Sequence, residues 1–139
     1  GELREGLYRS AQPMYKYEYQ WLRDSLGLEQ IVNLRAESRH DEHFAPELDI
    51  EVINIDVKDH CPPMLSDIET FKKALNKKVP TLFHCEHGQG RTSSFSIIAK
   101  VETGLLSFEE ALQDEMDRFH FHFKHQTQID FLKKLYLGY

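Results

Sequence analysis

What this sequence lacks excludes several classes of protein. It has only two cysteines in 139 residues, too few to form a disulfide scaffold. No apolar run approaches the ~20 residues that a membrane-spanning helix needs. Acidic residues (23) outnumber lysine and arginine (17), so the chain lacks the basic charge that typically binds nucleic acid or an anionic membrane. We therefore expect neither a nucleic-acid partner nor a membrane span.

The composition is that of a globular protein. Hydrophobic residues make up 40% and charged residues 29% of the chain, which disfavours disorder. A chain of this length can bury a sizeable core, so we expect one domain over residues 1–139. The chain starts without a signal-peptide pattern and without methionine. We expect a soluble protein, exported if a leader has been removed and cytoplasmic otherwise, and leave the oligomeric state open.

Short apolar runs alternate with segments of helical periodicity. Extended segments are predicted at residues 7–10, 31–34, 50–55 and 79–83. Helices are predicted at residues 14–26, 66–75, 92–102 and about 127–137, with a further helix opening at Ser107. Capping-box patterns occur at Ser66–Glu69 and Ser107–Glu110. This alternation predicts an α/β fold whose central, largely parallel sheet is flanked by helices.

The segment from His84 to Thr92 follows an apolar strand and opens a helix. Backbone N–H groups at a helix N-terminus favour a bound anion, and glycines let a loop curl around it. Arg91 adds a planar guanidinium that can hold two oxygens of a phosphate. Cys85 lies where these groups would stabilise a thiolate, which is a nucleophile. The segment therefore predicts phosphoryl transfer through a phosphocysteine intermediate. The residues expected to bind the phosphate are Glu86, His87, Gly88, Gln89, Gly90 and Arg91.

The spacing Cys-x5-Arg is the signature of the cysteine-based phosphatases. His84 before the cysteine and Thr92 after the arginine extend the match, so the pattern is specific. A buried structural cysteine beside an unrelated arginine is the alternative, and it leaves the flanking residues unexplained. A phosphate-binding module without activity is disfavoured because both the cysteine and the arginine are present. The nucleotide-binding pattern G-x-x-x-x-G-K-[ST] does not occur in the chain.

A phosphate monoester also needs a proton donor for its leaving oxygen. Loops that follow neighbouring parallel strands meet at one edge of a sheet, which directs attention to the loop after residues 50–55. Asp56 and Asp59 lie there. Asp56 continues the strand pattern, whereas Asp59 lies in the loop proper, between Lys58 and His60. We therefore favour Asp59 and keep Asp56 as the alternative.

Nearly the whole chain resembles the protein-tyrosine-phosphatase-like phytases, also called cysteine phytases, and more loosely the dual-specificity phosphatases. The stretches that carry the resemblance are Leu7–Pro13, Asn33–Ser38, Asp59–His60 and His84–Thr92. The resemblance implies a cysteine-phosphatase fold and no cofactor or metal. It also implies that Cys85 is the nucleophile, that Arg91 clamps the phosphate and that Asp59 is the general acid. In addition, Thr92 would donate to the Cys85 sulfur, and His84 would support the loop from behind.

A highly phosphorylated inositol would need several cations around the first phosphate. The loops at the predicted edge offer Arg9, Arg35, Arg39, His40, Lys58, His60 and His87. Each alone is more typical of a solvated surface, but together they favour a polyanion. We therefore expect an inositol polyphosphate phosphatase. The alternative is a protein tyrosine or dual-specificity phosphatase, whose pocket would need an aromatic wall; Tyr8, Phe44 and Met64 are the candidates for that wall.

Two further hypotheses concern residues outside the loop. The stretch His120–His125 reads His-Phe-His-Phe-Lys-His, and as a strand it would place histidines on one face, where they could share a metal. We favour instead a surface row of histidines over buried aromatic residues: Phe119, Phe121 and Phe123. Oxidation could join Cys61 to Cys85 as a reversible switch, although a free loop thiol is the interpretation we prefer.

Overall fold

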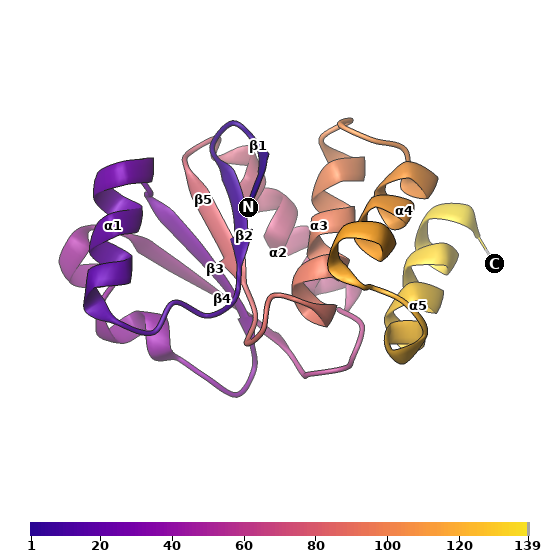
Figure 1. The fold of residues 1–139 in the computed structure, drawn as a ribbon, viewed down its shortest axis with the longest axis horizontal. Coiled ribbons are helices and arrows are strands. Elements are labelled where there is room, and N and C mark those ends of the chain that lie inside the picture. Colours follow the sequence, from indigo (N-terminus) through magenta and orange to yellow (C-terminus); the bar gives the residue numbers. More distant parts are fainter. Residues whose placement is uncertain (139) are drawn as a thin grey trace.

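The computed structural model describes residues 1–138, except for the side chain of Phe123. These residues form an α/β fold around a five-stranded sheet in the order β1-β2-β5-β3-β4 (Figure 1). The strands are β1 (Glu2–Arg4), β2 (Leu7–Ser10), β3 (Gln30–Arg35), β4 (Glu51–Val57) and β5 (Thr81–His84). Strand β1 is antiparallel to β2, and the other neighbouring strands are parallel. The predicted fold class is therefore confirmed.

Helices cover both faces of this sheet. They are α1 (Lys16–Leu26), α2 (Leu65–Asn76), α3 (Gly90–Glu102), α4 (Phe108–Phe119) and α5 (Gln126–Leu137), and short 3-10 turns occur at His40–His43, Pro46–Leu48 and Phe123–His125. Figure 1 shows α1 on one side of the sheet and α3, α4 and α5 on the other. Each side buries its own apolar cluster. Within residues 1–138, every helix is too short or too polar to cross a bilayer.

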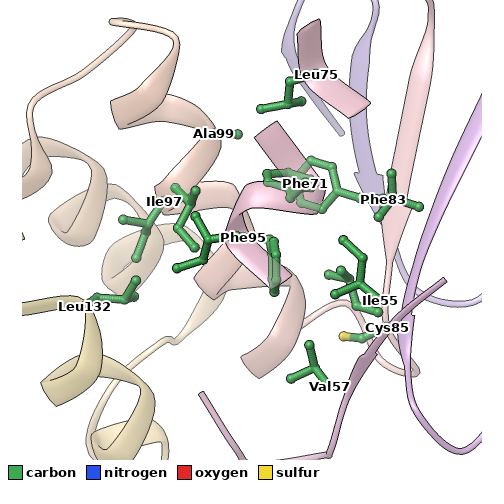
Figure 2. Close-up of a cluster of buried hydrophobic side chains, with 14 of the residues drawn as sticks. Ile55, Val57, Phe71, Leu75, Phe83, Cys85, Phe95, Ile97, Ala99 and Leu132 are labelled. Carbon is green, nitrogen blue, oxygen red and sulfur yellow. The ribbon is translucent and has the colours of Figure 1, made fainter. Parts of the chain in front are cut away.

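The larger apolar cluster holds the strand that leads into the signature loop. Phe71 of α2 meets Phe83 of β5 edge-on with ring centroids 5.5 Å apart, and it meets Phe95 of α3 at 4.9 Å. Edge-to-face packing of this kind adds stability beyond the area that it buries. Figure 2 shows the rings near the middle of the cluster and Cys85 at its margin, close to Val57. The core therefore fixes where β5 ends and where the thiol lies.

Helix α3 is buried over most of its length, because α2, α4, α5 and the sheet surround it. The sequence predicts that Phe95, Ile98 and Val101 form the apolar side of this helix; Phe95 and Ile98 are fully buried, and Val101 is partly buried. Polar residues of the same helix, such as Ser93 and Ser96, are buried as well. A strand and a helix that are both held by the core thus fix the two ends of the signature loop.

Three local predictions can be compared with the structure. The sequence does not predict β1, whose three residues are too few to show a period. The pattern Ser66–Glu69 misplaces the start of α2, because the Met64 N–H donates to the Asp67 carboxylate at 2.8 Å and the cap lies two residues earlier. The second capping box is confirmed. The Ser107 hydroxyl accepts from the Glu110 N–H at 3.2 Å, and the Glu110 carboxylate accepts from the Ser107 N–H at 3.1 Å.

Residues 120–125 form a turn between α4 and α5 rather than a strand. His120 ends α4 in the left-handed conformation, with φ of 56°, and a 3-10 turn follows at Phe123–His125. Phe121 is buried as expected, but His125 is buried too, so the predicted surface row of histidines is wrong in part. The expected burial of Phe123 lies outside the described side chains. The alternation of histidine and phenylalanine in this segment does not produce a strand, because the segment connects α4 to α5.

The carboxyl ends of the parallel strands meet at one edge of the sheet. The register pairs His84 with Ser10 of β2 and with Asn33 of β3, and it pairs Arg35 with Val57 of β4. The loops after β2, β3, β4 and β5 therefore leave the sheet beside one another. In open α/β sheets this edge is where ligands bind.

Candidate active site

Cys85 follows β5 directly and starts the signature loop. Its side chain is only 4% exposed. The Thr92 hydroxyl donates a hydrogen bond to Cys85 Sγ with a donor–acceptor distance of 2.8 Å. Hydrogen bonds to a charged acceptor are stronger than those to a neutral one, so this contact favours the thiolate. Helix α3 begins at Gly90, and its positive dipole end favours negative charge at the same place.

Two glycines allow the loop to pack against other segments. Gly88 has φ of +73°, and a Cβ there would lie 3.0 Å from the Ala11 nitrogen, in the chain after β2. A Cβ at Gly90 would lie 2.9 Å from Nε2 of Gln128, which belongs to α5. A side chain at Gly88 would be both strained and obstructed, since L-residues avoid this backbone region. The loop therefore requires glycine at a position where the sequence alone suggests only flexibility.

The guanidinium of Arg91 is 1% exposed, and its donors are divided between two partners. Nη1 donates to Glu37 Oε1 at 2.7 Å and to the Val57 carbonyl at 2.9 Å, and Nη2 donates to Glu37 Oε2 at 3.0 Å. A guanidinium has five N–H donors, so Nε and one hydrogen of Nη2 remain. Nε has no hydrogen-bond partner among the described residues. These two donors lie on one edge of the group and form the fork that can hold two phosphate oxygens.

Glu37 orients Arg91 and was not predicted as a site residue. Hydrogen bonds from Arg91 lower the pKa of Glu37 to about 2, with a smaller contribution from Arg35, although partial burial opposes the shift. The carboxylate is therefore ionised throughout the neutral range. Glu37 lies inside the stretch Asn33–Ser38, which carried part of the family resemblance, so a signal for it was present in the sequence.

Asp59 lies beside the free edge of Arg91, with Oδ1 3.7 Å from Arg91 Nε. It lines the same pocket as Cys85. The alternative, Asp56, instead forms an ion pair with Arg39 and is not among the residues that line this pocket in the described part of the chain. The position of Asp59 suits a group that reaches the leaving oxygen of a bound ester, which is the role we keep for it as a proposal.

His84 takes part in a buried hydrogen-bond network below the loop. Its Nε2 contacts the Asp41 carboxylate, and its Nδ1 lies 3.2 Å from the Cys85 carbonyl oxygen. Asp41 also accepts hydrogen bonds from the Tyr19 hydroxyl at 2.7 Å and from Gln12 Nε2 at 2.9 Å. Burial alone would raise the pKa of Asp41, but the hydrogen bonds from His84 and its other partners outweigh burial and lower it. His84 therefore contacts both Asp41 and the loop backbone, and its role in supporting the loop from behind stays a prediction. The sequence did not indicate Asp41.

Arg9 does not line the pocket, contrary to its predicted contact with substrate. Its side chain is buried and paired with Glu115 of α4. Nη2 donates to the Gly88 carbonyl at 2.8 Å and to the Ser93 hydroxyl at 3.2 Å, and the guanidinium lies 3.6 Å from the centroid of the Phe119 ring. Arg9 thus ties β2 to the back of the loop, which is a supporting position rather than a substrate contact.

The other predicted cations fall into three groups. His60 and His87 line the pocket over Cys85. Arg35 is bound by Gln12 Oε1 at 2.9 Å and by Glu37 at 3.0 Å, and Lys58 lines a shallow neighbouring hollow. The cations that lie away from the pocket are Arg39, which pairs with Asp56, and His40, which contacts the Met14 carbonyl oxygen. Of the signature loop, the pocket is lined by Cys85, Glu86, His87, Gln89, Gly90 and Arg91.

The pocket has a volume of about 290 Å³ and a wall that sequence reasoning missed. Lys124 and His125, from the turn before α5, complete it beside Gly90 of the signature loop. Burial lowers the pKa of His125, and the charge of the neighbouring Lys124 lowers it further. Both residues belong to the stretch His120–His125, so its unusual composition was a signal, although the strand and metal interpretations did not lead to this site.

No tyrosine, phenylalanine or tryptophan among the described side chains lines this pocket. Of the expected wall, Phe44 packs against Tyr19 with ring centroids 5.4 Å apart, and Tyr8 joins the smaller apolar cluster. Met64 is exposed before α2. The aromatic wall expected for a phosphotyrosine pocket is therefore not formed by these three residues.

The metal and redox hypotheses gain no support. Within the described side chains, no group of three histidine, cysteine or acidic residues is arranged to hold a metal ion. Both cysteines, which lie within residues 1–138, are free; Cys61 is exposed and Cys85 is buried. In the described chain Cys61 is not among the residues that line the pocket.

Comparison with known proteins identifies this arrangement. A family model described as "DSP-PTPase phosphatase fused to NAD+ Kinase" matches residues 2–130. No curated protein sequence matches the chain. The matched region includes Cys85, Arg91, Asp59 and the pocket wall formed by Lys124 and His125.

Solved structures share the fold at low identity. The active form of Tk-PTP is 20% identical with a TM-score of 0.78, and the match covers 99% of this chain and 95% of that one. A putative phosphatase from Shewanella putrefaciens CN-32 is 18% identical with a TM-score of 0.77, covering 100% and 89%. The core catalytic domain of the PP-IP phosphatase SIW14 from S. cerevisiae, in complex with citrate, is 21% identical with a TM-score of 0.72, covering 99% and 87%. These likenesses establish the cysteine-phosphatase fold.

Proposed function

This chain belongs to the family described as DSP-PTPase phosphatase fused to NAD+ kinase, and we propose that it acts as a cysteine phosphatase that hydrolyses inositol polyphosphates through a phosphocysteine intermediate. The proposal has two parts, which rest on different observations. The covalent step rests on the contacts of Cys85, Arg91 and Asp59. The substrate class rests on the charged lining of the pocket. In this proposal residues 1–139 act as one catalytic domain.

In the first step the Cys85 thiolate attacks phosphorus. A bond forms between sulfur and phosphorus, and the bond between phosphorus and the ester oxygen breaks. Asp59 gives its proton to that oxygen, so the product leaves as an alcohol. The free edge of Arg91 holds two of the non-bridging oxygens, whose charge is spread in the transition state. The loop N–H groups at the start of α3 hold the same oxygens.

In the second step water attacks the phosphocysteine. The Asp59 carboxylate, which has lost its proton, takes a proton from the water as the new bond between oxygen and phosphorus forms. The bond between sulfur and phosphorus breaks, and inorganic phosphate leaves. The hydrogen bond from Thr92 to Sγ, 2.8 Å long before the reaction, stabilises the departing thiolate. No metal ion or cofactor takes part in either step as proposed.

The lining of the pocket is the observation that supports a polyanionic substrate. Arg91, His60, His87, Lys124 and His125 surround the position above Cys85, and no described aromatic side chain does so. Asp59 and Glu86 line the pocket as well, but Asp59 is protonated when it acts as the acid, and Glu86 lies close to His87 and Arg35. The remaining cations attract a ligand that carries several negative charges. The shared fold with SIW14, a PP-IP phosphatase, is consistent with this substrate class.

A substrate panel tests the proposal. Phytate and a phosphotyrosine peptide are compared by kcat/KM under identical conditions, with the Cys85→Ser variant as the blank. We expect the higher kcat/KM for phytate. Peptide turnover without phytate hydrolysis would instead establish the second candidate, a protein tyrosine or dual-specificity phosphatase, which the family description favours.

A third substrate belongs in the same panel because of the family's second domain. A kinase that acts on NAD+ makes a phosphorylated NAD+, and the family description couples this phosphatase domain to such a kinase. Phosphorylated NAD+ is therefore tested beside phytate. If its kcat/KM exceeded that of phytate, inositol polyphosphates would have to be replaced as the proposed substrate class.

The covalent step is tested independently of the substrate. Rapid quenching of the wild-type protein with a ³²P-labelled ester should trap label on Cys85, and Cys85→Ser should bind phosphate without trapping label. Hydrolysis by Cys85→Ser at the wild-type rate would rule out the covalent mechanism.

A further inference from the structure

We infer that the turn before α5 forms a second phosphate-binding site beside the one above Cys85, and that Lys124 and His125 select substrates in which a second phosphoryl group lies next to the one being cleaved. This inference deepens the proposed function and rests on it for the substrate class. The site is built by residues far from the signature loop in sequence, and no comparison assigns it.

The volume of the pocket leaves room for a second group. At about 30 Å³ for each water molecule, a pocket of about 290 Å³ holds roughly ten waters. A phosphate group, with one phosphorus and four bonded oxygens, fills only part of that space. Lys124 and His125 line the same pocket, and His125 packs against Gly90 of the signature loop, where a Cβ would lie 3.1 Å from its Cδ2.

The charges around that space suit an anion. Lys124 and His125 come from one side, and His60, whose backbone adopts φ of 63°, comes from the loop that carries Asp59. Two carboxylates line the same pocket, Asp59 and Glu86. Asp59 is protonated when it acts as the acid, and Glu86 already lies 3.7 Å from His87 and 3.9 Å from Arg35. On the α5 side the cation that remains available to a second phosphate is therefore Lys124, with the His125 ring beside it.

Two buried side chains on the same side each have a nitrogen atom without a hydrogen bond in the described chain. His125 is 4% exposed and Gln128 is 1% exposed. His125 Nδ1 and Gln128 Nε2 have no hydrogen-bond partner among the described residues. The Gln128 amide lies against Gly90, at the start of α3. Leaving a buried polar atom unpaired costs about 1–3 kcal/mol, so an unpaired His125 nitrogen in the pocket wall is typical of a ligand-binding position. Gln128 lies next to this wall and is not among the described residues that line the pocket.

The helix geometry adds to this attraction. Figure 1 shows the N-terminal ends of α3 and α5 at the same end of the molecule, where the signature loop lies. Helix α5 has 12 residues, and its first turn, described in full, contains no acidic residue. The positive end of its dipole therefore faces the pocket without a carboxylate to neutralise it. In this inference the N-terminal end of α3 stabilises the phosphate that is cleaved, and the N-terminal end of α5 stabilises the second phosphate.

Inhibition by two small anions measures this second site directly. With para-nitrophenyl phosphate as the reporter substrate, inorganic pyrophosphate and orthophosphate are compared as competitive inhibitors. Pyrophosphate can occupy both positions, whereas orthophosphate occupies one. We expect the inhibition constant of pyrophosphate to be about tenfold lower, the factor that one charged hydrogen bond supplies. Equal inhibition constants in the wild-type protein would overturn the inference.

Lys124→Ala tests the assignment to this wall. The variant should weaken pyrophosphate inhibition about tenfold and orthophosphate inhibition by much less, and Lys124→Arg should restore most of the difference. Lys134→Ala is the matched control, because it removes the same charge from an exposed position about 12 Å further along α5. A similar loss in both lysine variants, or an equal loss for both anions, would contradict a local second site.

The two proposals fail in different ways. If the wild-type protein does not hydrolyse phytate but pyrophosphate still binds through Lys124, the substrate class is wrong and the second site is correct. If phytate is hydrolysed and Lys124→Ala leaves its KM and the pyrophosphate inhibition unchanged, the substrate class stands and the second site is rejected.

Discussion

Some N–H donors of Arg91 hold the side chain in place, and others are left to bind phosphate. Its outer edge is held by Glu37 and the Val57 carbonyl, while Nε and one Nη2 hydrogen stay free for phosphate. A phosphate-binding arginine without such a partner would sample several rotamers, and ordering it would reduce the binding free energy. Glu37 thus orients the Arg91 guanidinium before a phosphate binds.

Replacing Glu37 with glutamine should therefore affect both activity and stability. We expect kcat/KM for para-nitrophenyl phosphate to fall about tenfold, since the misplaced fork loses one charged hydrogen bond to the transition state. Glu47→Gln, in which an exposed carboxylate 3.7 Å from Lys16 is neutralised, is the control. Equal activity of the two variants would mean that Arg91 keeps its orientation without Glu37.

The stability effect of Glu37 should depend on pH in a defined direction. Hydrogen bonds from Arg91 lower the pKa of this carboxyl from 4.5 to about 2 in the folded protein. A lowered pKa stabilises the fold above the unfolded value, and this contribution is lost as the pH falls towards the folded value. Urea unfolding should show the difference between wild type and Glu37→Gln above pH 5 and its decline between pH 4.5 and 2. A difference that did not change over this range would contradict the pairing.

Asp59 and Asp56 can be separated by the leaving group. If Asp59 is the acid, Asp59→Asn should lower kcat/KM for an alkyl phosphate about 10²-fold or more. The loss should be much smaller for para-nitrophenyl phosphate, whose leaving group needs little protonation. Asp56→Asn is the matched control, because it removes a carboxylate that pairs with Arg39 instead.

The pH profile gives a second criterion for the same pair. A general acid must be protonated to act, so kcat/KM declines as the pH rises. That decline should disappear in Asp59→Asn and remain in Asp56→Asn. The opposite pattern would transfer the role to Asp56.

At the scale of the elements, a buried ionic cluster connects β2, α3 and α4 behind the loop. Glu115 of α4 pairs with Arg9 and with Lys100, whose Nζ lies 2.7 Å from Oε2, and it accepts from the Ser96 hydroxyl at 2.8 Å. Arg9 in turn donates to the Gly88 carbonyl of the signature loop. Helix α4 therefore supports the loop although it contributes no residue to the pocket.

Glu115→Gln should destabilise the fold by about 3 kcal/mol, because it removes the counter-charge of the buried Arg9 and one of the two carboxylates that pair with Lys100. The midpoint of urea unfolding is the measurement. Glu109→Gln, at an exposed position of the same helix, should change the free energy of unfolding by less than about 0.5 kcal/mol. A loss that small in Glu115→Gln would show that the cluster adds little to stability.

At the scale of the whole molecule, the net charge differs from the charge around the pocket. The chain carries a net charge of -6, whereas the pocket is lined by Arg91, Lys124 and three histidines as well as by Asp59 and Glu86. Interactions over more than about 10 Å are screened at 0.1 M salt, so the pocket and not the net charge governs binding in ordinary buffers. The acidic remainder of the surface favours solubility.

Ionic strength should therefore act on the two substrates to different degrees. Raising NaCl from 0.05 to 0.5 M should raise the KM for phytate at least about threefold more than the KM for para-nitrophenyl phosphate, since phytate contacts more of the charged wall. Sucrose of equal osmolarity should leave both values unchanged. An equal effect of salt on the two KM values would indicate that one phosphate alone is recognised.

The sequence alone determined the parts of this protein that are local. Alternating apolar runs and helical periods predicted the α/β sheet, because each element shows its own period within a dozen residues. Cysteine, glycines, arginine and threonine lie within eight positions of one another, so the chemistry of the loop could be deduced from their order.

The tertiary structure decided what lies around that loop. Glu37 meets Arg91 across 54 positions, Asp41 meets His84 across 43 and Glu115 meets Arg9 across 106. It also placed Arg9 outside the pocket and brought Lys124 and His125 to it. Such contacts leave no period in the sequence, because they depend on how helices and strands pack and not on the pattern within any one of them.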